Sequence, residues 1–273
     1  MMPVRVETFD SLDAAASALR STRSARFFGG GTLLMRAANH GDQSFDTLIR
    51  ARDPSFRHIR SESEGVSIGA GVTMKEIIAH RDLSFLIPAA QAVGGPAVRN
   101  MATVGGNLYA NSPYGDLAVA LLVLGARIEF VGQGGRGVEI EEFMRDRDRH
   151  QGSIVRAVVV PRPRDPSSFR FVKVSRVKPK GISLLTIATY LPQSGGRIRG
   201  ARVAYGAMGP RPLRATAVER LLDGQYLDSA TIERAAAAAC DGIEPRTDSL
   251  ASSWYRREVV GIHLKRLLTG DRR

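Results

Sequence analysis

The order of hydrophobic and polar residues predicts short strands and helices along the whole chain. Alternation with a period of two, or a β-branched run, predicts a strand, whereas apolar residues three and four apart predict a helix. The strands are predicted at 3–6, 25–28, 47–49, 126–131, 137–139, 154–160, 169–175, 183–190 and 198–205, with a further pair about a turn within 58–70. The helices are predicted at 11–19, 74–81, 117–124, 215–222, 229–240 and 252–268, with a helix or an extended turn at 33–38.

Proline-rich breaks divide these elements into domains. The segment Pro161-Arg-Pro-Arg-Asp-Pro166 is the strongest break, and Asp53-Pro54 ends a first β-α-β unit. The predicted domains are 1–166, with subdomains at about 1–53 and 54–166, and 167–273. In the second domain strands come first and helices follow, which predicts an α+β fold with helices on one face of an antiparallel sheet.

The first motif that suggests ligand binding is Gly29-Gly30-Gly31-Thr32, which follows the predicted strand at 25–28. Three consecutive residues without side chains expose backbone amides, and successive amides form a nest for an anion such as a pyrophosphate. The spacing G-x-G-x-x-G is absent and no Gly-Lys-Ser/Thr follows, so the motif is neither a dinucleotide fingerprint nor a Walker loop. Taken alone, it is explained equally well as a tight turn between a strand and a helix.

A second glycine loop lies in the stretch from Ala92 to Ala126, which is rich in small and polar residues. Thr103-Val-Gly-Gly-Asn107 offers the other half of a pyrophosphate cradle, or is a β-turn joining two strands. Asp116 precedes the apolar run 117–124, where a carboxylate can cap the start of a helix. Because such a stretch forms a poor core, it predicts a system of ligand-binding loops.

Several motifs occur in a fixed order along nearly the whole chain. They are Gly29-Gly-Gly-Thr-Leu-Leu34, Arg99-Asn-Met-Ala-Thr-Val-Gly-Gly-Asn107 with Ser112-Pro113 and Asp116, Lys173-Val-Ser-Arg176, Ala204-Tyr-Gly-Ala-Met-Gly-Pro210 with Pro212-Leu213-Arg214, and Tyr255-Arg256-Arg257. In these motifs and their order the chain resembles the FAD-binding (medium) subunits of molybdenum hydroxylases. That family includes the flavoprotein subunits of carbon monoxide dehydrogenase and of xanthine dehydrogenase-like enzymes.

The resemblance implies a fold, a cofactor and partners. The fold is an FAD-binding domain of the vanillyl-alcohol-oxidase type with two subdomains, followed by a smaller C-terminal α+β domain. FAD is expected without a covalent link, since no histidine or cysteine lies in the glycine loops. The implied role is electron transfer in an oxidoreductase with a molybdopterin-containing large subunit and a [2Fe–2S] small subunit, as a dimer of heterotrimers. The implied external acceptor is NAD, a quinone or oxygen, and no residue of this chain is expected to be catalytic.

The family pattern also implies which residues contact FAD. The expected contacts are Phe28, Gly29, Gly30, Gly31, Thr32, Leu33, Val93, Thr103, Gly105, Gly106, Asn107, Tyr109, Asp116, Val155 and Lys173. Lys173 is expected to stabilise the negative charge that a flavin gains on reduction. Tyr109 could stack on the isoalloxazine ring or be a packed core tyrosine. Val93 is expected against the other face of that ring.

The chain departs from the family pattern at four places. Gly29 stands where the family usually has alanine, and Leu33 where it usually has a polar residue. Tyr109 replaces a residue that is commonly small or aliphatic. After Lys173, the sequence Lys180-Gly181-Ile182 replaces a carboxylate that the family often has.

Composition limits the other functions. The single cysteine, Cys240, excludes an internal disulfide and an iron–sulfur cluster held by this chain alone, which needs about four ligands. The histidines are far apart in sequence and offer no metal site. No apolar run is long enough to span a membrane, and the N-terminus has no apolar signal core, so we expect a cytoplasmic protein.

The formal net charge of +12 raises the question of a nucleic-acid partner. The densest basic segment has eight Lys or Arg residues between Arg156 and Lys180. No nucleic-acid fold motif accompanies it, which favours a solvated or subunit-docking face. Two other interpretations stay open: a stand-alone FAD-dependent oxidoreductase with a related FAD domain, and a basic, cofactor-free protein whose glycine loops are structural.

Overall fold

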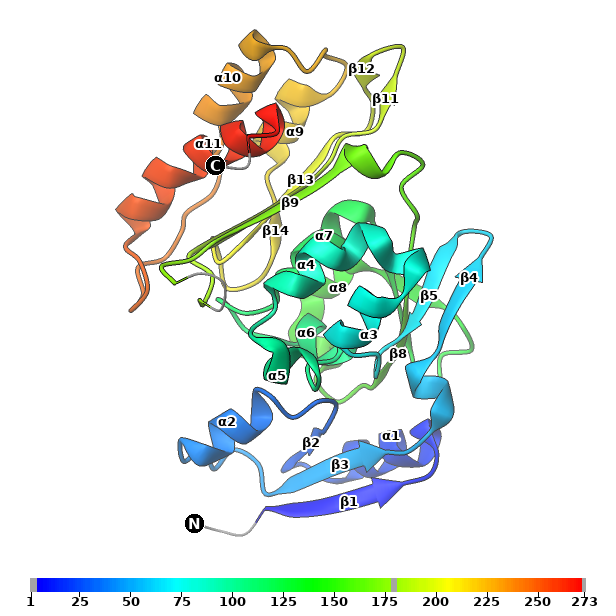
Figure 1. The fold of residues 1–273 in the computed structure, drawn as a ribbon. Coiled ribbons are helices and arrows are strands. Elements are labelled where there is room, and N and C mark those ends of the chain that lie inside the picture. The colour runs from blue at the N-terminus through cyan, green and yellow to red at the C-terminus, as the bar shows by residue number, and fades with distance from the viewer. Residues whose placement is uncertain (1–3, 178–180, 272–273) are drawn as a thin grey trace. The chain divides into compact units, whose positions relative to one another are not determined.

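The computed structural model describes residues 4–177 and 181–271 (Figure 1). The contacts between residues divide the chain into two compact units. Unit 1 comprises Met1–Leu83, Gly95–Ala110 and Gly125–Pro161, and unit 2 comprises Ser84–Gly94, Asn111–Leu124 and Arg162–Arg273. The chain thus passes between the units several times, whereas the sequence suggested one boundary after residue 166. That boundary stays a prediction.

The described part of unit 1 contains two sheets. One is parallel with the strand order β1-β3-β2, and the other is antiparallel with the order β4-β5-β8-β6-β7. The strands are β1 (Arg5–Phe9), β2 (Ala25–Phe27), β3 (Thr47–Ala51), β4 (Ile59–Glu62), β5 (Gly65–Gly69), β6 (Arg127–Phe130), β7 (Gly137–Glu139) and β8 (Val155–Val160). The helices are α1 (Leu12–Ser21), α2 (Leu34–Asn39), α3 (Met74–Ala79), α5 (Pro96–Arg99), α6 (Val104–Leu108) and α8 (Ile140–Asp146).

Local hydrogen bonds explain where two of these helices begin. The Ser11 hydroxyl accepts a hydrogen bond of 3.2 Å from the Ala14 amide, as a helix cap does. At α3, the Thr73 hydroxyl accepts from the Glu76 amide while the Glu76 carboxylate accepts from the Thr73 amide. Both caps are confirmed as predicted from the sequence.

Unit 2 is built on an antiparallel sheet with the strand order β14-β13-β10-β9. Its strands are β9 (Phe169–Val174), β10 (Leu185–Tyr190), β13 (Arg202–Gly206) and β14 (Leu213–Arg214), with a separate hairpin of β11 (Gln193–Ser194) and β12 (Arg197–Ile198). Its helices are α4 (Ile87–Ala92), α7 (Asp116–Leu124), α9 (Thr216–Leu222), α10 (Ser229–Ala237) and α11 (Ser253–Thr269).

Across both units, short 3-10 helices lie at Pro54–Arg57, Arg81–Leu86, Arg147–His150 and Pro166–Ser168.

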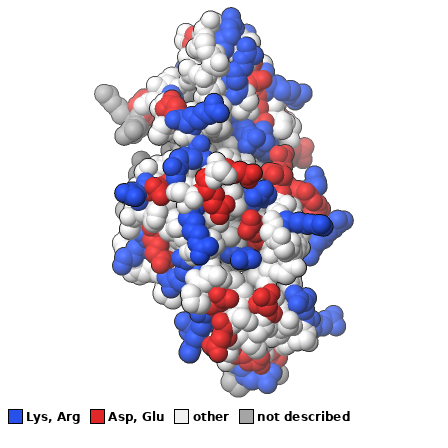
Figure 2. Space-filling view, turned by 90° about the vertical axis from the view of Figure 1, so that its right-hand side faces the viewer, with Lys and Arg blue, Asp and Glu red and all other residues white. Residues whose placement is uncertain are grey.

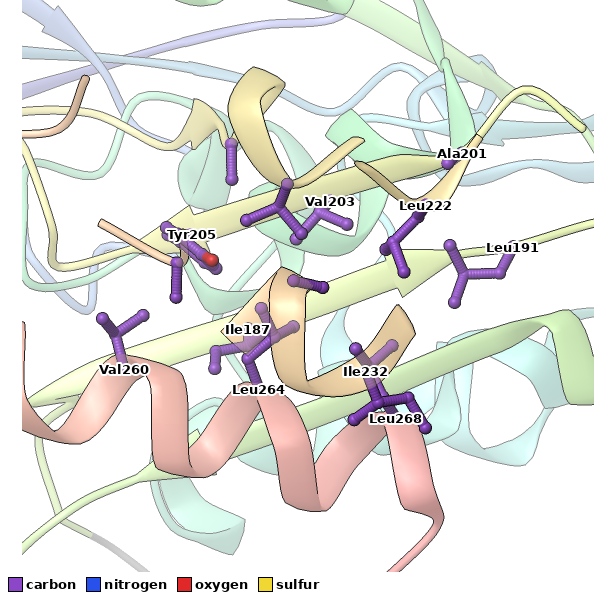
Figure 3. Close-up of a cluster of buried hydrophobic side chains, with 14 of the residues drawn as sticks. Ile187, Leu191, Ala201, Val203, Tyr205, Leu222, Ile232, Val260, Leu264 and Leu268 are labelled. Atoms are coloured by element: carbon purple, nitrogen blue, oxygen red, sulfur yellow. The ribbon is translucent and has the colours of Figure 1, made fainter. Parts of the chain in front are cut away.

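Helices cover both faces of this sheet. On one face, Ile187 and Val203 point toward α10 and α11, where Leu264 closes a core of buried side chains (Figure 3). On the other face, α7 packs along β10 and β13, and every residue of α7 is buried. The sequence predicted helices on one face only, because α7 precedes the sheet in the chain and gave no sign of packing on it.

The strand predicted at 198–205 is wrong in its extent. The structure divides it into β12 and β13, with Gly200 between them at a φ of 72°. Only glycine adopts such a conformation readily, so the chain turns there rather than continuing as a strand. The start of the strand predicted at 3–6 includes Pro3, which lies outside the described residues.

The basic segment 156–180 is not one continuous exposed face. Arg170 donates hydrogen bonds to the carbonyls of Leu267 and Leu268 at the end of α11, and Lys173 is mostly buried. Lys178 and Lys180 lie outside the described residues. On the face drawn in Figure 2, basic side chains are mixed with acidic ones. No helix in the described part of the chain is long and apolar enough to cross a membrane.

Tyr205 carries a buried hydroxyl group that lowers stability. The residue is 0% exposed, its hydroxyl has no hydrogen-bond partner among the described residues, and burial raises its pKa. Because an unsatisfied buried hydroxyl is unfavourable, Tyr205→Phe is expected to raise the free energy of unfolding of the FAD-free chain by about 1 kcal/mol.

Tyr109→Phe is the control of opposite sign, since the Tyr109 hydroxyl donates to the carbonyls of His150 and Ser153. Its removal should lower the free energy of unfolding by about 1–2 kcal/mol. Thermal or denaturant unfolding of both variants measures the two effects. If both changes destabilise the chain equally, the Tyr205 hydroxyl has a partner after all.

Candidate functional site

The first glycine loop connects β2 to α2 in unit 1. Gly31 has a φ of 71°, in the region that favours glycine. A Cβ atom at Gly31 would lie 2.4 Å from the ring of Phe28, so that ring occupies the space beside the turn. The local sequence therefore fixes the shape of the loop, and any side chain at Gly31 would disturb it.

The loop leaves a row of backbone amides without partners. The amide of Phe28 is the last to donate to the neighbouring strand, over 2.7 Å to the Ile49 carbonyl. Among the described residues, none accepts a hydrogen bond from the amides of Gly29 to Leu33. Successive unpaired amides bind an anion. The structure thus has the row of bare amides that the sequence predicted, and its contact with FAD stays a prediction.

The second glycine loop lies directly beside the first. A Cβ atom at Gly30 would lie 1.7 Å from the Met101 carbonyl oxygen, and one at Gly29 would lie 2.9 Å from the Thr103 hydroxyl. Glycine at both positions is what allows this approach. Two loops that are far apart in sequence are thus brought together within unit 1, as predicted from their composition.

The second loop does not supply bare amides, which corrects the sequence analysis. It forms the short helix α6, whose first amides are already used. Val104 donates to the Val72 carbonyl over 2.9 Å, Gly105 to the Ala70 carbonyl over 2.8 Å, and Gly106 to the Thr103 hydroxyl over 3.1 Å.

Gly106 itself is exposed, and a Cβ atom there would meet only the Thr103 hydroxyl, at 3.1 Å. Asn107, in contrast, is buried. The surface of α6 over Gly106 is therefore bare and open. This surface can border a ligand that is bound by the free amides of the first loop. The amides of Val104, Gly105 and Gly106 already donate hydrogen bonds within the protein.

Tyr109 follows α6 and is held by the protein in a fixed position. Its hydroxyl donates over 2.9 Å to the His150 carbonyl and over 3.1 Å to the Ser153 carbonyl. Its ring meets Phe143 edge to face, with centroids 5.5 Å apart. Burial raises the pKa of Tyr109 even though the nearby charge of Arg147 lowers it, so the hydroxyl stays protonated and keeps donating. These contacts pack the Tyr109 ring within unit 1, and its contact with the isoalloxazine stays a prediction.

Of two further buried residues near α6, the sequence analysis named one and missed the other. Val155, an expected FAD contact, is 3% exposed within β8. Arg147, which the sequence analysis missed, is 5% exposed and donates to the carbonyl of Ala110 over 2.8 Å and of Leu108 over 3.4 Å. It binds the carbonyl end of α6 and so helps to hold the glycine loop in place. No sequence pattern distinguishes Arg147 from its neighbouring surface arginines.

Unit 2 brings Asp116 and Lys173 together. The Lys173 ammonium donates over 2.9 Å to the Asp116 carboxylate and over 2.7 Å to the Ala92 carbonyl at the end of α4. The side chains of Lys173 and Asp116 are only 12% and 8% exposed. Val93, the next residue after Ala92, is half-buried.

Two hydroxyl groups that the sequence analysis missed complete this arrangement. Ser183 and Thr186 each donate to the other oxygen of Asp116, over 2.6 Å in both cases. The Asp116 carboxylate therefore accepts hydrogen bonds from Ser183 and Thr186, whereas its position in the sequence suggested a helix cap. The sequence held one sign of the role of Thr186, namely a polar residue within the buried strand predicted at 183–190.

Gly206 explains how α7 comes this close to the sheet. It lies opposite Thr186 in the pairing of β13 with β10. A Cβ atom at Gly206 would lie 2.8 Å from a methyl group of Val119 in α7. A side chain there would push α7 away, so this glycine allows Asp116 to reach the hydroxyl groups of the sheet.

Comparisons with known proteins identify the family. The family described as the FAD binding domain in molybdopterin dehydrogenase matches residues 3–163, and the CO dehydrogenase flavoprotein C-terminal domain matches residues 170–270. The chain belongs to this flavoprotein family. Its cofactor is accordingly FAD, it is an oxidoreductase subunit, and its α+β fold class is confirmed.

Relatives of similar length match nearly the whole chain. The glyceraldehyde dehydrogenase medium chain of Sulfolobus acidocaldarius is 29% identical over 262 residues, covering 93% of this chain and 92% of its own. The carbon monoxide dehydrogenase medium chain of Afipia carboxidovorans is 26% identical, covering 93% and 91%.

Solved structures show the same fold. Quinoline 2-oxidoreductase from Pseudomonas putida 86 matches with a TM-score of 0.87 at 25% identity, covering 98% of this chain and 96% of that chain. Reconstituted CO dehydrogenase from Oligotropha carboxidovorans matches with a TM-score of 0.88 at 25% identity, covering 98% of both chains.

Proposed function

We propose that this chain is the electron-transfer subunit of a molybdenum-dependent hydroxylase or dehydrogenase. It would take electrons from a [2Fe–2S] subunit and pass them to an external acceptor, which is NAD, a quinone or oxygen. The observation that carries this proposal is the row of unpaired amides from Gly29 to Leu33 within a chain of the FAD-binding family. Bound FAD supplies the redox chemistry, and the protein binds and orients it and adjusts its electrostatic surroundings.

We infer that the FAD contacts are those expected from the sequence. In unit 1 they are Phe28, Gly29, Gly30, Gly31, Thr32, Leu33, Thr103, Gly105, Gly106, Asn107, Tyr109 and Val155, and in unit 2 they are Val93, Asp116 and Lys173. The unpaired amides would bind the pyrophosphate, and the bare surface at Gly106 would face it. Lys173 and Asp116 would adjust the charge near the isoalloxazine ring. The division into domains at 1–166 and 167–273 belongs to the same proposal.

The proposed partners are a molybdopterin-containing large subunit and a [2Fe–2S] small subunit, in a dimer of heterotrimers. Several relatives support this, since their names describe them as medium chains or FAD subunits of dehydrogenases. The proposed location is the cytoplasm. The single cysteine is in keeping with this, because cytosolic proteins rarely contain disulfides.

The isolated chain is expected to oxidise neither a purine, nor an aldehyde, nor carbon monoxide. Its FAD should become reduced when the large and small subunits and their substrate are added together. Anaerobic spectra of the chain, alone and with each partner, measure this. Oxidation of any of these substrates by the molybdenum-free isolated chain would contradict the proposal and favour a stand-alone FAD oxidoreductase.

A further inference from the structure

A closed set of hydrogen bonds fixes the arrangement of Asp116 and Lys173. Lys173 and Thr186 are direct cross-strand partners in β9 and β10. The Thr186 hydroxyl and the Ser183 hydroxyl both bind Oδ1 of Asp116, while the Lys173 ammonium binds Oδ2. Ser183 is 2% exposed and Thr186 is 0% exposed, so these donors are held inside the protein.

We propose that Ser183 and Thr186 are positioning residues that set the balance of charge between Asp116 and Lys173, and thereby the reduction potential of the bound FAD. The proposal rests on the proposed function, since it takes Asp116 and Lys173 as FAD contacts. Neither hydroxyl group needs to touch the cofactor. Each acts through the Asp116 carboxylate.

The charges explain how two neutral hydroxyl groups can have this effect. Hydrogen bonds to a carboxylate stabilise its negative charge and reduce the field that it exerts on its surroundings. Lys173 has three N–H donors, of which Asp116 and the Ala92 carbonyl take two. Within residues 4–177 and 181–271, the third has no acceptor and is available to a ligand. Its direction depends on where Asp116 is held.

Removing one hydroxyl should therefore make FAD harder to reduce. In Thr186→Val the Asp116 charge is less compensated, and it draws the Lys173 ammonium toward itself. Both changes disfavour the negative charge that reduction adds to the flavin. We expect the equilibrium constant for reduction to fall about tenfold, which is about 30 mV for a two-electron couple. Asp116→Asn should shift the potential in the opposite direction, because it removes the negative charge.

Thr189 provides a matched control on the same strand. It is also 0% exposed, but its hydroxyl has no hydrogen-bond partner among the described residues. It lies three positions after Thr186 and therefore points to the opposite face of the sheet. Thr189→Val makes the same chemical change at the same depth, and we expect it to leave the potential unchanged.

The first experiment measures the reduction potential of the FAD-loaded chain for Thr186→Val, Thr189→Val and Ser183→Ala. A downward shift in Thr186→Val and Ser183→Ala but not in Thr189→Val supports the proposal. Equal potentials in all three variants overturn it. Ser183→Ala keeps the test possible if Thr186→Val does not fold.

The second experiment needs no flavin. Acetic anhydride labelling of the FAD-free chain, followed by peptide mass spectrometry, reports how well Lys173 is protected. Lys173 should be labelled more slowly than in the wild-type chain in Thr186→Val and Ser183→Ala, because Asp116 holds its ammonium more strongly, and at the wild-type rate in Thr189→Val. Equal labelling in all three variants overturns the proposal. A chain that takes up no FAD would instead disprove the proposed function, and the labelling result would still decide this inference.

Discussion

Replacing Gly106 by valine is expected to abolish FAD retention while the chain stays folded. The Cβ atom would meet only the Thr103 hydroxyl, at 3.1 Å, so the protein itself can accept the side chain. The added methyl groups would fill the open surface beside the unpaired amides of the first glycine loop. Losing about two charge-assisted hydrogen bonds to the pyrophosphate should weaken FAD binding by at least about 100-fold. Flavin content after gel filtration measures the effect.

Gly152→Val is the matched control for this change. Gly152 also has open space at its Cβ position and no positive φ, and it lies outside both glycine loops. It should retain FAD as the wild-type chain does. Gly30→Val is less informative, because its Cβ would lie 1.7 Å from the Met101 carbonyl and would force the two loops apart. Stoichiometric FAD in Gly106→Val would show that α6 does not face the cofactor.

Arg256→Leu should cause the largest loss of stability in unit 2. Arg256 is 1% exposed, and its guanidinium donates to the carbonyls of Leu184, Arg246 and Ala251 and to the Asp248 carboxylate. Leucine would remove the guanidinium donor from all four acceptors, among them the carbonyl of the buried residue Leu184. Removing one partner from such a network costs about 3–5 kcal/mol. Denaturant unfolding of the FAD-free chain measures this.

Arg257→Leu is the control, since the neighbouring Arg257 is exposed and its loss should change the free energy of unfolding by less than about 0.5 kcal/mol. Equal effects of the two changes would contradict the role of Arg256.

The stability supplied by Asp248 should also depend on pH. Burial raises the pKa of Asp248, but hydrogen bonds from the amides of Leu250 and Ala251 and from Arg256 outweigh it and hold the pKa below its usual value. A carboxylate with a lowered pKa stabilises the fold above its unfolded pKa of about 3.9, and this contribution is lost as the pH falls below that value. Arg256→Leu should therefore reduce the acid sensitivity of unfolding.

The sequence predicted those features of the structure that depend on residues close together in the chain. The caps at Ser11 and Thr73 were correct because the capping residue and its amide partner are three positions apart. The bare amides of the glycine loop after β2 were predicted because consecutive glycines act through the backbone itself, while their contact with FAD stays a prediction. The α+β class followed from the order of strands and helices.

Contacts between distant segments could not be predicted in this way. Ser183 meets Asp116 across 67 positions, and Arg256 meets Leu184 across 72. The position of α7 on the antiparallel sheet of unit 2 depends on Gly206, and a single sequence gives no sign that this glycine contacts α7. The amides of α6 seemed free because their acceptors, Val72 and Ala70, belong to another segment of the chain.

Amide hydrogen exchange with and without FAD tests the central claim most directly. The amides of Gly29 to Leu33 have no acceptor among the described residues, whereas those of Val104 and Gly105 already donate to carbonyls. If the first loop binds the pyrophosphate, FAD should slow exchange strongly at Gly29 to Leu33 and much less at Val104 and Gly105. Unchanged exchange at Gly29 to Leu33 in a chain saturated with FAD would contradict the account.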